Sequence, residues 1–211
     1  MATYDLEEQE QIDALKHFWR DYGRLIIAAV VAFIVGVGGT QGWKHYKRTQ
    51  AEQASLEFVK LEEAVGKGDV NEIRNVAQDI ITEYASTAYA QMAALVVAQT
   101  EREAGDLDAA AQRLEWVVDT ARTEEVQLLA RLRLAAVLLD QDEYDAALQL
   151  LDHDVTEAFV GAYADLRGDV LVAQGKAAEA RAQYEQALEQ SRENSAWRDV
   201  VQLKLDALSS E

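Results

Sequence analysis

Few side chains in this sequence have types and spacings that suit chemistry. The three histidines stand at positions 17, 45 and 153. Only His153 has carboxylates on both sides, in the run Asp152-His153-Asp154, and these side chains are common ligands of divalent metals. Adjacent residues on a helix point in different directions. We therefore interpret this run as a solvated helix end rather than a metal site.

A second acidic run, residues 140–145, partly resembles a calcium-binding loop. Such a loop needs glycine at its sixth position and glutamate at its twelfth, where this chain has Asp145 and Leu151. We interpret the run as a turn between helices. Phosphate-binding, dinucleotide-binding and nucleophile-elbow motifs do not occur in the sequence. The sequence therefore predicts no catalytic, cofactor-binding or metal-binding residue, and a protein that is not an enzyme.

Aromatic side chains of the C-terminal part are the remaining candidates for contacts with a partner. For each of them, burial in a core is the favoured interpretation over partner binding, since repeat proteins bury aromatic residues. The candidates are Tyr84, Tyr89, Trp116, Tyr163, Tyr184 and Trp197.

The elements that position these residues are helices. The chain has no proline, the residue that breaks helix interiors, and it is rich in strong helix formers. Three stretches share one pattern when Ala110, Ala147 and Ala180 are aligned, at offsets of 37 and 33 residues. These offsets bracket the tetratricopeptide period of about 34 residues. The agreement favours a repeat array over a plain helical bundle.

Each repeat is predicted to consist of two antiparallel helices that touch through small residues. The first helix supplies Ala98, Ala135 or Gly168, and the second supplies Ala110, Ala147 or Ala180. Larger residues fill the space between neighbouring repeats, namely Leu114, Leu151 and Tyr184.

The turns and ends of the array are predicted from capping residues. Gly105 and Gly175 suit left-handed C-caps, while Asp106 and Asp142 suit N-cap or first-turn positions. A weaker repeat precedes these three. Residues 49–67 are predicted to lead from the membrane segment described below into the first helix of this repeat. A single helix that begins near Trp197 is predicted to cap the last repeat.

An uncharged run near the N-terminus, Leu25 to Thr40, predicts a membrane anchor. Extended to Trp43, it has about 19 residues, close to the roughly 20 that a helix needs to cross a bilayer. Aromatic residues bracket it, as is typical of membrane interfaces. A cleaved signal peptide is the alternative, but the long acidic segment before the run is unlike a signal start. The pattern favours a retained transmembrane helix over residues 25–43.

The orientation of this anchor stays open at the level of residues. Three basic residues flank each end, so the positive-inside rule does not choose between the two topologies. Gly38 and Gly42 have the spacing that lets membrane helices approach closely, although glycine is common in membrane helices in general.

The C-terminal part is strongly acidic. Residues 49–211 hold 14 Lys or Arg and 32 Asp or Glu, and the formal net charge of the whole chain is −18. Nucleic-acid binding needs a basic surface, so this composition argues against nucleic-acid partners. The acidity is explained by solubility or by a basic partner, with solubility the favoured reading. Cysteine is absent, so disulfides and cysteine metal sites are excluded.

Several blocks of residues carry a family resemblance over nearly the whole chain. Beside the membrane they are Leu15-Lys16-His17-Phe18-Trp19, Gly23 and Gly42-Trp43-Lys44-His45-Tyr46. In the C-terminal part they are Ala164-Asp165-Leu166-Arg167-Gly168-Asp169, Gly175 and Ala180-Arg181. In these blocks and their order, the chain resembles the YfgM-like ancillary subunits of the SecYEG translocon.

The resemblance implies an all-α protein with one N-terminal transmembrane helix and a tetratricopeptide-like repeat domain. It implies a cytoplasmic head (1–24), a transmembrane helix (25–43) and a periplasmic repeat domain (44–211) in the bacterial inner membrane. The implied partners are SecYEG, a PpiD-like periplasmic chaperone and unfolded translocated proteins, with no cofactor. The implied role is to assist newly translocated proteins and link the channel to chaperones. A scaffold or regulatory adaptor of another envelope complex is the alternative.

Overall fold

The computed structural model describes residues 2–190 and 195–208, and all regular elements within these ranges are α-helices. The described residues form two compact units, divided between Gln50 and Ala51. The prediction of an all-α fold is confirmed.

Helix α1 (Ala2–Lys67) carries the predicted membrane segment in the first unit. One window of 18 residues near the N-terminus has the length and composition to cross a membrane, and none of it is buried in protein. Phe33 and Ile34, for example, are 72% and 62% exposed. A buried core helix would hide such side chains from solvent, so the exposure fits a lipid-facing segment. The helix continues through residues 25 and 43 without a break.

Aromatic and basic side chains cluster at both ends of the apolar run. On one side the rings of Phe18 and Tyr22 have centroids 5.2 Å apart, and on the other those of Trp43 and Tyr46 lie 5.8 Å apart. The Nζ atom of Lys47 lies 5.3 Å from the centroid of the Trp43 ring. Rings with one apolar and one polar side suit the headgroup level of a bilayer.

The C-terminal end of α1 belongs to the second unit and pairs with α2 (Val70–Glu83). Phe58, Leu61 and Ala64 of α1 share one core cluster with residues of α2 and α3. The α2 members are Ile73, Ala77 and Ile80. This packing confirms the prediction that residues 49–67 lead into the first helix pair.

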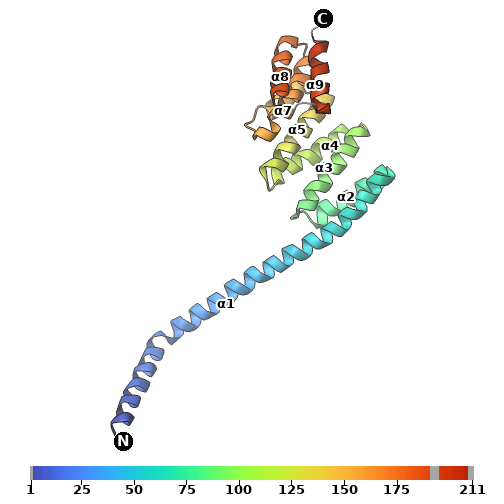
Figure 1. Ribbon diagram of the computed structural model, residues 1–211. Helices are drawn as coiled ribbons and strands as arrows, with labels where there is room; N and C mark the ends of the chain where they lie inside the picture. Colours follow the sequence, from blue (N-terminus) through green and yellow to red (C-terminus); the bar gives the residue numbers. More distant parts are fainter. Residues whose placement is uncertain (1, 191–194, 209–211) are drawn as a thin grey trace. The chain divides into compact units, whose positions relative to one another are not determined.

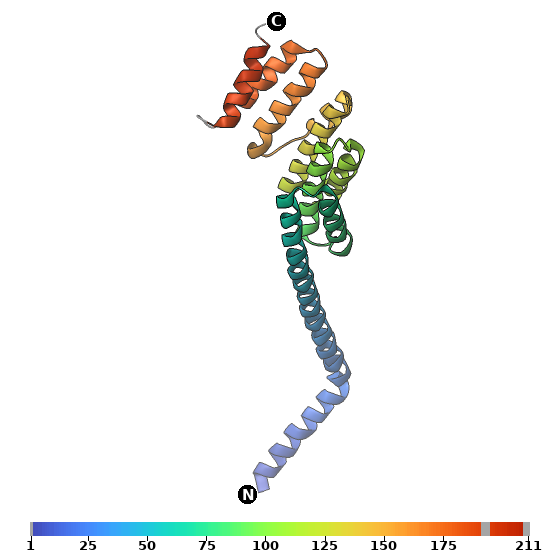
Figure 2. The same ribbon diagram turned by 90° about the vertical axis from the view of Figure 1, so that its right-hand side faces the viewer.

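Three further helix pairs follow, and Figure 1 shows them in succession along the second unit. They are α3 (Ala88–Glu103) with α4 (Leu107–Thr120), α5 (Glu124–Asp140) with α6 (Tyr144–Leu151), and α7 (Glu157–Ala173) with α8 (Ala177–Glu189). Helix α9 (Ala196–Ala207) packs on the last pair, as predicted for a capping helix. Figure 2 shows α7, α8 and α9 side by side.

The small residues that define the repeat are buried, as predicted. Ala110, Ala147 and Ala180 have no exposed surface in the second helices of the three pairs. In the first helices, Ala98 and Ala135 are likewise buried, and so is Gly168. Leu114 of α4 reaches the next pair, where it joins a cluster with Leu134 of α5. The core is therefore a series of clusters between neighbouring helices.

The turns within the pairs share one left-handed residue. Gly105 and Gly175 have φ values of 81° and 75°, which confirms their predicted roles. In the middle pair this position is occupied by Asp142, with φ 63°, and Glu143 is the N-cap of α6. The prediction that Asp142 caps or begins a helix is therefore wrong. Its carboxylate instead accepts a hydrogen bond of 2.6 Å from the Tyr144 hydroxyl.

Asp106 stands at the N-cap of α4, as predicted, but its side chain makes no capping hydrogen bond. It accepts a hydrogen bond of 3.0 Å from Arg74 of α2 instead. A hydrogen bond to the preceding helix pair thus replaces the capping bond to the backbone of α4.

Candidate protein-binding surface

The predicted aromatic candidates divide into core residues and partly exposed residues. Tyr163 and Tyr184 are 3% and 2% exposed, so both belong to the core. Tyr84, Tyr89, Trp116 and Trp197 are partly buried. For Tyr163 and Tyr184, the favoured interpretation of core packing is confirmed.

The hydroxyl groups of the two buried tyrosines form hydrogen bonds inside the protein. Tyr163 donates a hydrogen bond of 2.8 Å to the Leu128 carbonyl of α5, and burial raises the pKa of Tyr163 to about 12. Tyr184 donates a bond of 2.8 Å to Asp169, and burial together with this bond raises the pKa of Tyr184. Neither hydroxyl is available to a partner.

The Asp165-Leu166-Arg167-Gly168-Asp169 block of α7 fastens the capping helix. The Lys204 ammonium of α9 donates hydrogen bonds of 2.7 Å to Asp165 and 2.8 Å to Asp169. The Trp197 indole donates to Asp165 at 3.2 Å. Burial lowers the pKa of Lys204, but the bonds to the two carboxylates outweigh it and hold this pKa above its usual value. The two aspartates therefore have a structural role.

The remaining polar residue of this block joins α7 to the preceding pair. The Arg167 guanidinium donates a hydrogen bond of 2.5 Å to the Leu151 carbonyl, at the last residue of α6. It also contacts the Gln183 side chain of α8 at 3.5 Å. A guanidinium carries several donors in a planar fork, so this one side chain of α7 can bond to α6 and α8 at the same time.

A buried carboxylate plays a similar role among the first pairs. Glu101 of α3 is 2% exposed and lies 3.9 Å from Arg74 of α2 and 3.8 Å from Arg113 of α4. Burial raises the pKa of Glu101, the two arginines oppose this, and the net direction is upward. One of its oxygens has no hydrogen-bond partner. The residue thus links three helices at a cost in desolvation.

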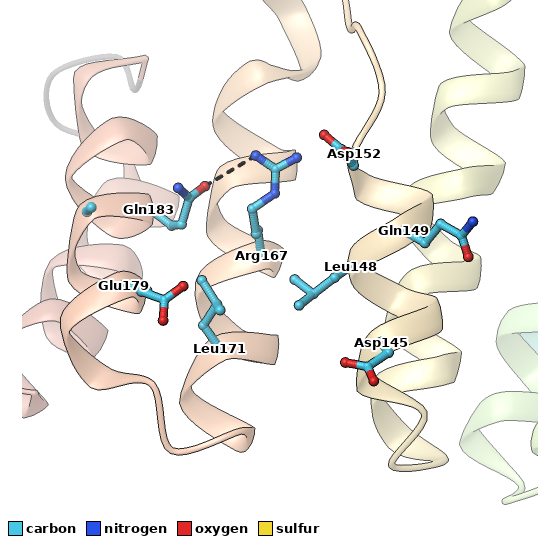
Figure 3. A pocket seen from close by; sticks show the side chains of 9 residues that line it. Asp145, Leu148, Gln149, Asp152, Arg167, Leu171, Glu179 and Gln183 are labelled. Atoms are coloured by element: carbon cyan, nitrogen blue, oxygen red, sulfur yellow. Dashed lines mark hydrogen bonds between the residues drawn. The ribbon is translucent and has the colours of Figure 1, made fainter.

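An open groove of about 620 Å³ lies between α6 and α8, with α7 beneath it. Figure 3 shows Leu148 of α6 and Leu171 of α7 pointing toward each other at its centre. Carboxylates stand on both sides: Asp145 and Asp152 at α6, and Glu179 on α8. All three are exposed residues. The groove therefore combines an apolar floor with an acidic rim.

A smaller groove lies at the equivalent place between α2 and α4, with a volume of about 260 Å³. Its α4 residues Ala109, Gln112 and Arg113 precede the α8 residues Glu179, Ala182 and Gln183 by 70 positions each. The same repeat positions thus line both grooves. Trp116 and Arg113 line the smaller one, so its character is aromatic and basic rather than acidic.

The histidines and acidic runs considered in the sequence do not come together. His17 and His45 are exposed on α1, and His153 is exposed after the end of α6. Within residues 2–190 and 195–208, the structure contains no group of three or more His, Cys, Asp or Glu arranged to hold a metal ion. Residues 140–145 form the end of α5, a turn and the start of α6.

Sequence reasoning did not identify Glu101, Arg167 or Lys204 as structural links. A signal was available for two of them. Glu101 follows Ala94, Val97 and Ala98 in the register of the buried stripe of α3, and Lys204 stands three residues after buried Val201. A charged residue at an apolar-face position requires a buried partner.

The chain is similar to proteins of one kind over nearly its whole length. Residues 16–210 match a family model described as a tetratricopeptide repeat-like domain. A protein of Neisseria gonorrhoeae named "Ancillary SecYEG translocon subunit" is 34% identical over 99% of this chain and 100% of its own length. Proteins with the same name in Haemophilus influenzae and Escherichia coli are 35% and 31% identical, over 88% and 99% of this chain and 90% and 100% of their own lengths.

Proposed function

The chain belongs to the tetratricopeptide repeat-like family of ancillary SecYEG translocon subunits, and from this premise we propose that it is a non-enzymatic ancillary subunit of the SecYEG translocon. The observation that carries the proposal is similarity over the whole architecture. The match spans both the exposed apolar helix and the helix pairs. A shared repeat domain alone would not support a translocon partner, because repeat folds serve many functions.

The helix and the family fit a single-pass inner-membrane protein. In the proposed topology, residues 1–24 are cytoplasmic, residues 25–43 span the membrane and residues 44–211 are periplasmic. The repeat body then lies on the side where translocated chains emerge. The body carries the whole net charge of −18, so it is repelled by anionic lipid on whichever side of the membrane it lies.

The proposed mechanism is tethering. An anchor beside the channel raises the effective concentration of the repeat body for emerging chains and for a membrane-bound chaperone of the PpiD kind. Tight intrinsic binding is then unnecessary. Stacked helix pairs provide an extended surface for such contacts. Through them, the protein would assist newly translocated chains and pass them to periplasmic chaperones.

Crosslinking in cells tests the proposal. After crosslinking, purification of the tagged full chain should enrich SecY and a PpiD-like chaperone over an unrelated single-span protein expressed at the same level. No enrichment of SecY would overturn the translocon role. Enrichment of SecY without the chaperone would retain the translocon role and remove the proposed link to chaperones.

Protease treatment of spheroplasts tests the topology. In the proposed orientation, protease digests the repeat body from outside and leaves a protected N-terminal fragment that contains the head and the span. Protection of the body until the membrane is lysed would reverse the orientation.

A client assay separates assistance from scaffolding. In detergent or nanodiscs, the full chain should slow the aggregation of an unfolded periplasmic client in proportion to its concentration. A scaffold without a chaperone-related role would leave the aggregation rate equal to that with empty nanodiscs.

A further inference from the structure

The groove between α6 and α8 has the chemistry of a binding site for one kind of protein segment. We propose that it docks a partner segment in which an apolar side chain is flanked by lysine or arginine. This inference rests on the proposed function, since it names the chemistry of a segment that the repeat body binds. The occupant is defined by this chemistry: an apolar side chain for the floor of the groove and a basic side chain for its acidic rim.

The two walls of the groove are helices of unequal length. Helix α6 has only 8 residues and ends at Leu151, whereas α8 has 13. The chain then runs without helix from residue 152 to residue 156. Leu148 is partly exposed and points toward Leu171 (Figure 3). The volume of about 620 Å³ is in the range of roughly 300–1,000 Å³ that is typical of binding pockets.

The charges of the rim select a basic partner. Asp145 and Asp152 on one side and Glu179 on the other are exposed at the mouth of the groove. Among the described residues, none of these three carboxylates forms an ion pair with a cation of this chain. The Asp145 carboxylate accepts a hydrogen bond of 3.0 Å from the side-chain amide of Gln174. A lysine or arginine that enters beside the apolar floor would find an unpaired carboxylate on either side.

Arg167, the cation among the described residues that line the groove, does not neutralise this rim. Arg167 is directed to the Leu151 carbonyl at 2.5 Å and to Gln183 at 3.5 Å. It therefore serves the packing of three helices. The three carboxylates contribute −3 and Arg167 contributes +1, so the lining of the groove has a formal charge of −2.

The equivalent groove between α2 and α4 shows that this chemistry is not a general property of the repeat. There, Arg113 stands at the repeat position of Gln183, and Ala109 at that of Glu179. The Trp116 side chain lines the smaller space. Only the groove between α6 and α8, of these two, joins a large volume to an acidic rim.

Binding of a defined peptide to the full chain in nanodiscs tests the proposal. The probe is a fluorescein-labelled synthetic peptide with two leucines flanked by lysines, and its partner peptide has glutamate in place of each lysine. Fluorescence anisotropy should detect binding of the basic peptide and not of the acidic one. Binding should weaken with added salt, because exposed charges are screened over about 8 Å at physiological ionic strength.

Two variants locate the binding site by different means. Glu179→Lys reverses a rim charge, and Ala182→Phe fills the groove without altering a charge. Both positions are exposed, so both variants should fold. Each variant should lower the affinity for the basic peptide by about tenfold. The matched controls are Glu185→Lys and Ala178→Phe, exposed α8 residues outside the groove lining, which should change affinity by less than about twofold.

The outcomes separate this inference from the proposed function. If Glu179→Lys and Glu185→Lys lower the peptide affinity equally, the attraction is an unspecific one to an acidic body, and the proposed docking site is overturned. Equal binding of the two peptides, or no binding of the basic one, would overturn it as well. These results leave crosslinking of the wild-type chain to SecY unaffected, whereas a failure of that crosslinking removes the translocon role and leaves the peptide result standing.

Discussion

The ring of Tyr184 lies directly on the backbone of Gly168, so that a Cβ atom on this glycine would be 2.4 Å from the Tyr184 Cε1 atom. The two residues belong to the two helices of the last pair. The other pairs place Ala98 and Ala135 at the corresponding position. Of these three equivalent positions, the one in the last pair needs glycine, because a ring rather than an aliphatic chain from the second helix covers it.

Gly168→Ala should therefore destabilise the protein. The ring is tied to Asp169 and cannot move away freely, so we expect a loss of about 1–3 kcal/mol in the free energy of unfolding, the usual cost of overpacking. The control is Gly66→Ala on α1, where a Cβ atom meets nothing within 4 Å and helix propensity favours alanine by about 1 kcal/mol. Urea unfolding of the detergent-solubilised chain, followed by circular dichroism, measures both. Equal effects would contradict the close contact.

The left-handed turn residues should respond to substitution in opposite directions. Asp142→Gly relieves a non-glycine residue at φ 63° and should be neutral or stabilising by up to about 1 kcal/mol, after the loss of the bond from Tyr144. Gly105→Ala places a Cβ atom at φ 81° and should cost about 1–2 kcal/mol. Melting temperatures measured under one condition give the comparison. A stabilising Gly105→Ala would show that the turn relaxes.

Glu101 should produce a pH dependence of stability. Its pKa in the folded state lies above the ordinary value of 4.5 because of burial. The folded state therefore holds this proton more tightly than the unfolded state, and the associated stability is full below about pH 4.5 and is lost as pH rises through the folded pKa. Glu101→Gln should flatten the unfolding free energy over this window. The exposed neighbour variant Glu103→Gln should retain the wild-type profile, and a wild-type profile in Glu101→Gln would refute the assignment.

The hydroxyl of Tyr163 should contribute to the joint between α5 and α7. Tyr163→Phe removes its hydrogen bond to the Leu128 carbonyl and should cost about 1 kcal/mol. Tyr89→Phe is the control, since Tyr89 is partly buried and its ring packs on Phe58 with centroids 5.7 Å apart. Absorbance at 295 nm adds a second readout, because Tyr163 should ionise only near pH 12. A normal titration near pH 10 by all tyrosines would contradict this burial.

A charge in the apolar run should release the protein from membranes. Ile34→Arg places a cation near the middle of the predicted span and should cost about 2.5–3.5 kcal/mol of insertion free energy. We expect part of the variant to be extracted by alkaline carbonate. Leu56→Arg is the control, because Leu56 is 67% exposed on the same helix but beyond the span. Equal extraction of both variants would argue against residues 25–43 as the anchor.

The sequence alone determined the elements and their order. The length of the apolar run and its lack of charge were enough to predict the membrane helix. The recurring small residues Ala110, Ala147 and Ala180 were enough to predict the helix pairs. Such signals are local: a helix face or a turn is encoded within about ten residues. The turn at Asp142 escaped this reading, because aspartate is also a common N-cap and only the backbone conformation separates the two roles.

The tertiary structure decided which polar groups meet and where the surface is hollow. Lys204 reaches Asp165 across 39 positions and Arg74 reaches Asp106 across 32, and these partnerships depend on how helices cross. The groove lies beside α6, which ends after 8 residues although no glycine or proline marks that end. Side-chain partners and cavities arise from the packing of separate helices, whereas helices and turns arise from neighbouring residues. For this reason the sequence predicted the architecture, and the structure was needed to locate a binding surface.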